Sequence, residues 1–307
     1  MEDTSHESVM VWKFLRRHFV QIVIGMVLVL AVYGLMTAYV PYQREQRIVK
    51  AIEAIGGRVG HGYFGPNWVP KYMWDRPTVF NRVWELDLNN TQVTDADLDH
   101  LKGLTNLVVL RLHNTQVTGP GLQHLKGITN LTILLLDSTQ VTDAGLESLK
   151  GLTNLRDLDL RNTQITDAGL EHIKGLTNLK TLHLWHNEQI KDAGLEHLKG
   201  LTNLEHLYLN STQVTDAGLQ HLKGLTNLKT IHLANTQVTD AGLEHLKGLI
   251  NLTDLCLINT QITDTGLEHL KGLANLMDLS LHITKTTAEG RAMLRQTLPY
   301  CEIRPEP

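Results

Sequence analysis

The chain of 307 residues is dominated by a repeat of 24 residues, seen in full in residues 155–178 (LRDLDLRNTQITDAGLEHIKGLTN). Eight copies begin at equivalent apolar positions: Val83, Leu107, Leu131, Leu155, Leu179, Leu204, Leu228 and Leu252. A degenerate ninth copy begins at Leu276, and the fifth copy, residues 179–203, carries one extra residue. Self-similarity at a fixed period predicts a solenoid, because each unit packs only against its neighbours.

Each copy has two halves with different periods. In the fourth copy, residues 155–160 alternate, with Leu158 facing one side and the aspartates the other, as in a short strand. Residues 166–176 predict a short helix with Thr166 as its N-cap. Gly175 is expected to end this helix with a positive φ. One copy cannot bury its leucines alone, whereas stacked copies can.

The order LxxLxLxxT followed by Thr-Asp-Ala-Gly-Leu resembles the leucine-rich repeat, and its second half is similar to the cysteine-containing and GALA-type subclasses. The resemblance covers about residues 83–303. It implies an α/β solenoid with a parallel sheet on the concave face and short helices on the convex face. It also implies binding of a ligand more often than catalysis, so we expect a protein–protein interaction module.

The N-terminal part predicts a membrane anchor. Residues 1–18 form a short tail, and residues 19–42 contain no charged residue and are long enough to cross a bilayer as a helix. A cleaved signal peptide and a buried core helix are the alternatives. Basic residues flank both sides evenly, so only the short tail with Arg16 and Arg17 favours a signal-anchor with the repeats outside. This arrangement resembles bacterial membrane-tethered leucine-rich repeat proteins.

Both ends of the solenoid are expected to be capped, because terminal repeats need a shielded outer face. Residues 43–82 predict a juxtamembrane helix and an N-terminal cap, whose aromatic run at 63–74 has a binding loop as its alternative interpretation. The eight repeats occupy residues 83–275. Residues 276–307 hold the degenerate ninth repeat and a C-terminal cap.

Two polar positions recur in the repeats and are interpreted as structural. A threonine follows each strand in most copies, and its inward hydroxyl is expected to bond backbone groups of adjacent coils. An asparagine precedes each strand, from Asn106 to Asn275, and is expected to satisfy backbone groups of the turn.

Composition and motifs exclude several functions. The net charge is only −4 and the repeats contain no basic run, so nucleic acid is not an expected partner. Cys256 and Cys301 lie too far apart in a solenoid to pair. No catalytic or cofactor fingerprint is present, so we expect no enzyme, no cofactor and no metal. One repeat position holds seven histidines, interpreted as a solvated convex stripe: His100, His124, His172, His197, His221, His245 and His269.

The outward strand positions vary between copies, and variation on a constant frame is where a repeat protein encodes recognition. They predict an apolar zone at Ile133 and Leu135, and an acidic zone at Asp137, Asp157 and Asp159. The third zone is aromatic and imidazole-rich, and it supplies the predicted binding residues: Thr181, His183, Trp185, His206, Tyr208, Asn210, Thr230 and His232. Large exposed aromatic side chains are enriched at binding hot spots.

The leading interpretation is therefore a membrane-tethered module that binds a protein or peptide on its concave face. The first alternative is a substrate-recognition adaptor resembling F-box-associated, ubiquitin-ligase-type leucine-rich repeat proteins, although residues 19–42 resemble an anchor rather than an F-box. The second is an enzyme that uses the concave histidines and aspartates, although a shallow, wet face lacks the enclosed pocket of most catalytic sites. The ligand and the oligomeric state are not predicted.

Overall fold

The computed structural model describes residues 40–63, 81–304 and 23–30, with a few single positions between residues 13 and 36. The chain divides into two compact units. The first comprises residues 1–50 and 61–82, and the second comprises residues 51–60 and 83–307. The predicted aromatic cap segment lies almost wholly outside the described residues.

One sheet runs through the chain, and its strand order follows the sequence from β1 to β11. Every pair from β2 to β11 is parallel, and equivalent positions of successive repeats lie side by side. Most strands have three residues, and the bounds are β1 Arg58–Tyr63, β2 Asn81–Asp87, β3 Val109–Arg111, β4 Ile133–Leu135, β5 Asp157–Asp159, β6 Thr181–His183, β7 His206–Tyr208, β8 Thr230–His232, β9 Asp254–Cys256, β10 Asp278–Ser280 and β11 Glu302–Arg304.

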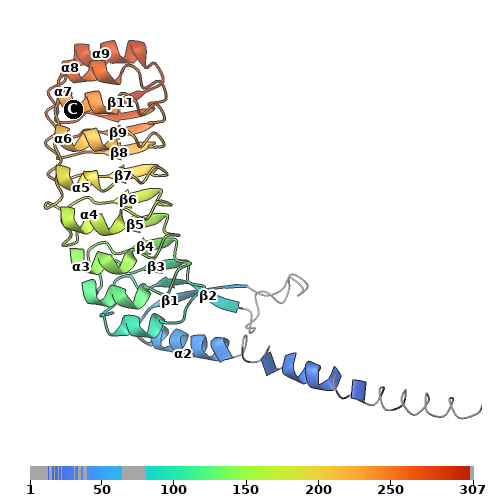
Figure 1. Cartoon of the computed structure of the whole chain (residues 1–307). Helices are drawn as coiled ribbons and strands as arrows, with labels where there is room; N and C mark the ends of the chain where they lie inside the picture. The colour runs from blue at the N-terminus through green and yellow to red at the C-terminus, as the bar shows by residue number, and fades with distance from the viewer. Residues whose placement is uncertain are drawn as a thin grey trace, which may run out of the picture. The chain divides into compact units, whose positions relative to one another are not determined.

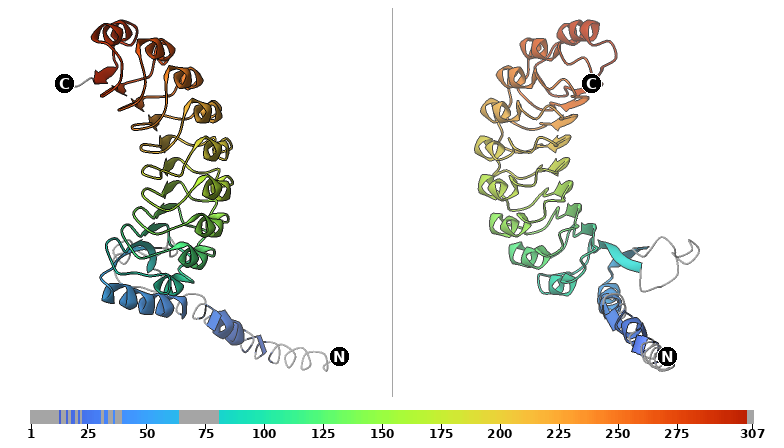
Figure 2. Two further views of the ribbon diagram at one scale, coloured as in Figure 1. Left: turned by 90° about the vertical axis from the view of Figure 1, so that its left-hand side faces the viewer. Right: turned by 45° about the vertical axis from the view of Figure 1, so that its right-hand side comes forward.

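Short helices return the chain between strands. The α-helices are α2 Val40–Ala54, α3 Asp143–Leu146, α4 Asp167–Ile173, α5 Asp192–Glu196, α6 Asp216–Leu219, α7 Asp240–Leu243, α8 Asp264–Leu267 and α9 Ala288–Thr297. The 3₁₀ turns are η3 Asp97–Leu101, η4 Gly119–Leu125, η5 Glu147–Leu149, η6 Gln220–Leu222, η7 Glu244–Leu246 and η8 Glu268–Leu270. Within the second unit, the strands line the inner side of an arc and the helices its outer side (Figures 1 and 2).

The core lies between these two layers. Leu158, Leu160, Leu170, Ile173 and Leu176 of the fourth repeat are all fully buried, and their equivalents repeat along the solenoid. The predicted inward face of the strand and helix is confirmed. The expected helix ending is wrong, because the described glycines with positive φ are Gly56 and Gly103 and not Gly175.

The helix instead tightens into a turn, as the N–H of Leu176 donates to the carbonyl of Ile173 at 2.9 Å. The left-handed position lies after the strand, where the residue before the repeated threonine has a positive φ. Asparagine or serine occupies it in seven of the nine copies, and both bond locally. His186 and Ile283 occupy the other two.

The repeated threonines do not link coils as expected. The hydroxyl of Thr115 donates to the carbonyl of Leu112, three residues earlier in its own coil, at 2.8 Å, and its equivalents do the same. A carbonyl of the same coil lies within reach of the short side chain. Thr163 is an exception, because its hydroxyl bonds the carbonyl of Leu160 and also lies 3.1 Å from Asn187 Oδ1 of the next coil. The asparagines before the strands do link coils: Asn178 Nδ2 donates to the carbonyl of Thr153 at 2.8 Å.

The Thr-Asp-x-Gly-Leu half of the repeat is also an inter-coil link. Asp192 accepts hydrogen bonds from the backbone N–H of Thr215, at 2.8 Å, and from its hydroxyl, at 2.6 Å. The same carboxylate fills the space beside Gly218, where an added Cβ would lie 2.5 Å from Asp192 Oδ1. The aspartate therefore contacts the following coil, and the glycine leaves room for the aspartate of the preceding one.

The extra residue of the fifth repeat is accommodated in the turn after β6. The N–H of Ile190 donates to the carbonyl of Asn187 at 3.1 Å and closes a turn that contains Glu188 and Gln189. The turn after β6 thus takes up the extra residue, and the strand keeps its register with β7. Asn187 replaces the usual threonine and does bridge two coils, because its amide donates to the carbonyls of Leu160 and Leu184, at 2.8 and 2.9 Å.

The first unit contains the predicted anchor segment. Residues 23–30 are helical, and apolar side chains such as those of Val29 and Leu30 are about two-thirds exposed. Parts of residues 19–42 lie outside the described residues. Of the helices that the structure does describe, none is both long and apolar enough to cross a membrane.

Candidate binding surface

Parallel, in-register pairing turns the outward positions of the strands into rows across the concave face. Thr181, His206 and Thr230 form part of one row, and His183, Tyr208 and His232 form part of the next. These residues come from three adjacent strands, β6 to β8. The spacing of the repeats therefore brings six of the eight predicted binding residues onto one patch.

Three rings of this patch touch one another, and we call them the ring cluster: His183, Tyr208 and His232. His183 and Tyr208 stack with their ring centroids 4.4 Å apart and their planes 5° apart. Tyr208 meets His232 edge to face at 4.8 Å. His232 Nε2 lies 3.1 Å from Asp254 Oδ2 on β9, which holds the last ring in place. The cluster is a half-buried aromatic surface.

The polar members of the predicted set are engaged in the fold. His206 Nδ1 lies 3.0 Å from the hydroxyl of Thr230. Thr230 as a residue is only 6% exposed. The side-chain oxygen of Asn210 accepts a hydrogen bond from the N–H of Ala234 at 2.9 Å. These residues support the surface around the ring cluster, and Thr230 offers little area to a ligand.

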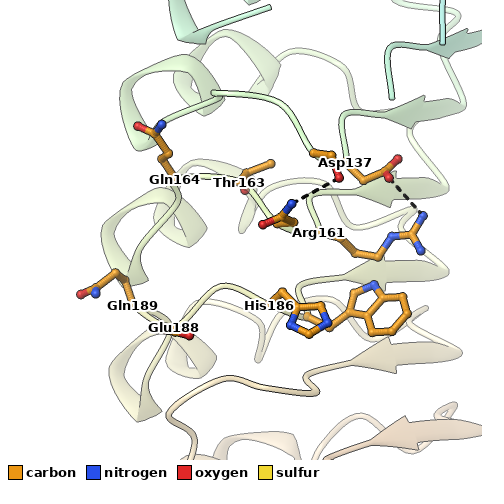
Figure 3. Close-up of a pocket in the computed structure, with 10 residues that line it drawn as sticks. Asp137, Arg161, Thr163, Gln164, His186, Glu188 and Gln189 are labelled. Atoms are coloured by element: carbon orange, nitrogen blue, oxygen red, sulfur yellow. Dashed lines mark hydrogen bonds and ion pairs between the residues drawn. The ribbon is translucent and has the colours of Figure 1, made fainter. Parts of the chain in front are cut away.

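Trp185 belongs to a second feature, an open hollow of about 750 Å³ beside the turn that holds the extra residue. Arg161 lies over the indole, 5.1 Å from the ring centroid, and His186 stacks beside it at 5.5 Å. Figure 3 shows Arg161 reaching towards Asp137 while Glu188 and Gln189 lie at the far side of the hollow. The predicted binding residues do not include Arg161 or Glu188, although the repeat spacing alone places Arg161 one coil before Trp185.

The predicted acidic zone is largely neutralised. The guanidinium of Arg161 lies 2.6 Å from Asp159 and 3.5 Å from Asp137, and both carboxylates are almost fully buried beneath it. Asp137 also pairs with His113. Asp157 differs, because its Oδ1 is buried and has no hydrogen-bond partner. The zone therefore presents one unpaired carboxylate rather than three.

Burial shifts the ionisation of this face. Desolvation, followed by repulsion from Asp159, raises the pKa of Asp157 to about 6. Desolvation also lowers the pKa of His183 and of His206, and raises that of Tyr208. The side chains of His183, His206 and Tyr208 are consequently held in their neutral forms at pH 7. The surface combines neutral rings with carboxylates.

The convex histidines are not the fully solvated stripe that the sequence predicted. All but His100 are half-buried against neighbouring helices, and the Nδ1 atoms of His172 and His245 are buried without a partner. Desolvation lowers the pKa of His221, which opposes charging of the stripe. Among the described residues, no three metal-ligating side chains converge on one point.

Known proteins match this repeat pattern. The family described as "Leucine Rich repeats (2 copies)" matches residues 129–175, 153–200, 177–224 and 202–248. The solved structure of internalin C2 from Listeria monocytogenes is 32% identical, with a TM-score of 0.56, over 70% of this chain and 84% of that chain. The chain belongs to the leucine-rich repeat family.

A second leucine-rich repeat structure, from Leptospira interrogans, shares the fold at a TM-score of 0.54 and 21% identity, over 67% of this chain and 56% of that chain. No curated protein matches this chain significantly. Leucine-rich repeat proteins generally act in protein–protein interaction and are typically scaffolds without enzymatic activity. The concave ring cluster and the Trp185 hollow are therefore candidate contacts for a protein partner.

Proposed function

We propose that this leucine-rich repeat protein is a membrane-tethered interaction module that binds a protein or peptide on its concave face. The observation that carries the proposal is the ring cluster, three touching rings on an open face beside Trp185. Stacked aromatic side chains offer a large contact area at little cost in conformational entropy, and they dominate binding hot spots.

Membrane tethering is supported by the apolar helical residues 23–30, whose exposed side chains need an apolar environment. We place the repeats on the outer side. The subclass proposal, cysteine-containing or GALA-like, is supported by the aspartate and glycine of the inter-coil link. An adaptor of the F-box-associated type would use the same concave face, so the identity of the partner separates the two roles.

The concave face is tested by site-specific photocrosslinking in native membranes. A photoreactive residue at Tyr208 should give a discrete crosslinked partner, whereas one at His221 on the convex side should not. The double variant Trp185→Ala/Tyr208→Ala should lose partner capture while its melting curve stays nearly unchanged. Loss of capture from Glu85→Ala/Asp87→Ala instead, with none from the first pair, would move the site to the N-terminal end of the solenoid.

Tethering is tested by fractionation. Full-length protein should sediment with membranes and resist carbonate extraction, and external protease should reach the repeats in intact cells. A mature N-terminus near residue 40 would indicate a cleaved signal peptide instead. Repeats that stay protected until the membrane is opened would reverse the proposed orientation.

A further inference from the structure

The charges of the concave face are mostly paired with one another. Arg111 lies 2.8 Å from Glu85, and Arg304 lies 2.7 Å from Asp278. Arg161 is occupied by Asp159 and Asp137. Among the described strands from β5 to β9, this leaves Asp157 with an unpaired oxygen and Asp254 with only an imidazole as its partner. Among the described strands, Asp157 and Asp254 are therefore the carboxylates of the outward row through Thr181 and His206 that lack a lysine or arginine partner. Beside this row, Lys180 and Lys229 both pair with Glu205.

Asp157 is the less satisfied of the two. Its Oδ1 is buried without a hydrogen-bond donor, and a buried acceptor left without a donor is costly. The register places Ile133 on one side of it and Thr181 on the other. Ile133 is half-buried and apolar, so it can pack against the aliphatic part of a long side chain. Asp157 as a whole is only half-buried, so a lysine or arginine of a partner can approach its carboxylate from the open face.

The two carboxylates lie in the same row, on β5 and β9, four strands apart. At the usual spacing of about 4.8 Å between strands, that separation is roughly 19 Å. An extended chain advances about 3.3 Å per residue, so roughly six residues cover the distance. Because side chains alternate, positions i and i+6 point to the same side of the ligand. The ring cluster lies between the two carboxylates.

We propose that the partner contributes an extended segment with two basic side chains six positions apart, one seated on Asp157 and the other on Asp254. The residues between them lie over His183 and Tyr208, where a cation or an apolar side chain gains from the aromatic faces. The inference rests on the proposed function, because it assumes that the concave face binds a protein. It adds the chemistry and the spacing that select the partner.

The test selects random twelve-residue peptides displayed on phage against the immobilised full-length protein. Peptides that bind the wild type but not Tyr208→Ala should be enriched in lysine or arginine at positions i and i+6. For synthetic copies of these peptides, Asp157→Asn and Asp254→Asn should each weaken binding about 10- to 100-fold, as expected for loss of a charge-assisted hydrogen bond. Affinity should also fall as salt is raised.

Asp278→Asn is the matched control, because it removes a carboxylate of the same row that, unlike Asp157 and Asp254, has an arginine partner, Arg304. It should change peptide affinity little. Tyr208-dependent peptides without basic pairs, or unchanged affinity in Asp157→Asn, would overturn the inference and leave the proposed function standing. Failure to obtain any peptide that depends on Tyr208 would count against both. Displacement by spermine as effective as displacement by the peptides would assign the site to a small polyamine instead.

Discussion

At the scale of single residues, the regular repeat makes it possible to recognise the positions that depart from the pattern. Asp157 carries an unpaired carboxylate where its neighbours are satisfied, and Ile283 takes a left-handed conformation that asparagine usually fills. Both departures cost folding energy, which is common where a surface serves binding. The Asp157 departure lies on the candidate binding face, whereas the Ile283 departure lies in the last repeat, away from that face.

Asp157→Asn should stabilise the protein in a pH-dependent way. The pKa of Asp157 is raised to about 6, so the folded protein holds a proton that the unfolded chain releases between roughly pH 4 and 6. The contribution of this carboxyl to the free energy of unfolding is therefore most favourable below pH 4, and it declines as the pH rises through 6. Urea unfolding should show the variant gaining stability at pH 8 and little at pH 4. An equal gain at both pH values would contradict the assignment.

Ile283→Asn should raise the free energy of unfolding by about 1 kcal/mol, because a β-branched residue is strained at its φ of 56°. The reciprocal change in the preceding repeat, Asn259→Ile, should lower stability by a similar amount and also removes the hydrogen bond from Asn259 Nδ2 to Asn235 Oδ1. Chemical denaturation of both variants checks the pair. A loss of stability in Ile283→Asn would show that its side chain contributes packing.

At the scale of the repeat element, the aspartate and glycine of Thr-Asp-x-Gly-Leu act in opposite directions along the solenoid. The first repeat has Asp97 where later copies have glycine, and this aspartate caps Thr94 of its own coil at 2.9 Å. The last repeat has Ala288 in place of the aspartate but keeps Gly290 against Asp264. The missing glycine of the first repeat and the missing aspartate of the last match coils that have only one neighbouring repeat. The second repeat departs from this pattern, because Gly119 replaces its aspartate and lies against Gly145 of the third.

Gly218→Ala should therefore be destabilising, because its methyl group would lie against Asp192 and the coils would have to separate. We expect a loss of about 1–3 kcal/mol, typical of overpacking. Gly224→Ala is the matched control in the same repeat: no atom lies within 4 Å of its added Cβ, so it should be neutral or slightly stabilising. In an Asp192→Ala background the cost of Gly218→Ala should shrink, and an unchanged cost would exclude the clash.

At the scale of the whole solenoid, stability comes from interfaces between neighbouring coils, so position along the chain decides how far a defect spreads. Leu158 lies in β5 and is fully buried, whereas Leu279 lies in β10, next to the last strand that the structure describes. Leu158 and Leu279 are equivalent leucines, one in a central coil and the other in a terminal coil.

Leu158→Ala should cost about 2–5 kcal/mol by opening a cavity in the central coils. Leu279→Ala should increase hydrogen exchange mainly in β10, β11 and α9, because only the end of the solenoid opens. Exchange mass spectrometry distinguishes local from global opening. A melting temperature of Leu158→Ala close to that of the wild type would contradict the inward placement of this leucine.

The sequence by itself determined the repeat, the inward leucines, the order of parallel strands and the patch from Thr181 to His232, since a constant period places equivalent positions side by side. It also located the extra residue beside Trp185. Tertiary structure alone decided which charges cancel, because pairing depends on side chains from different coils meeting: Arg161 covers Asp159 and Asp137 and leaves Asp157 unpaired. It likewise decided that the threonine hydroxyls bond within their own coil, because the short side chain reaches a local carbonyl first.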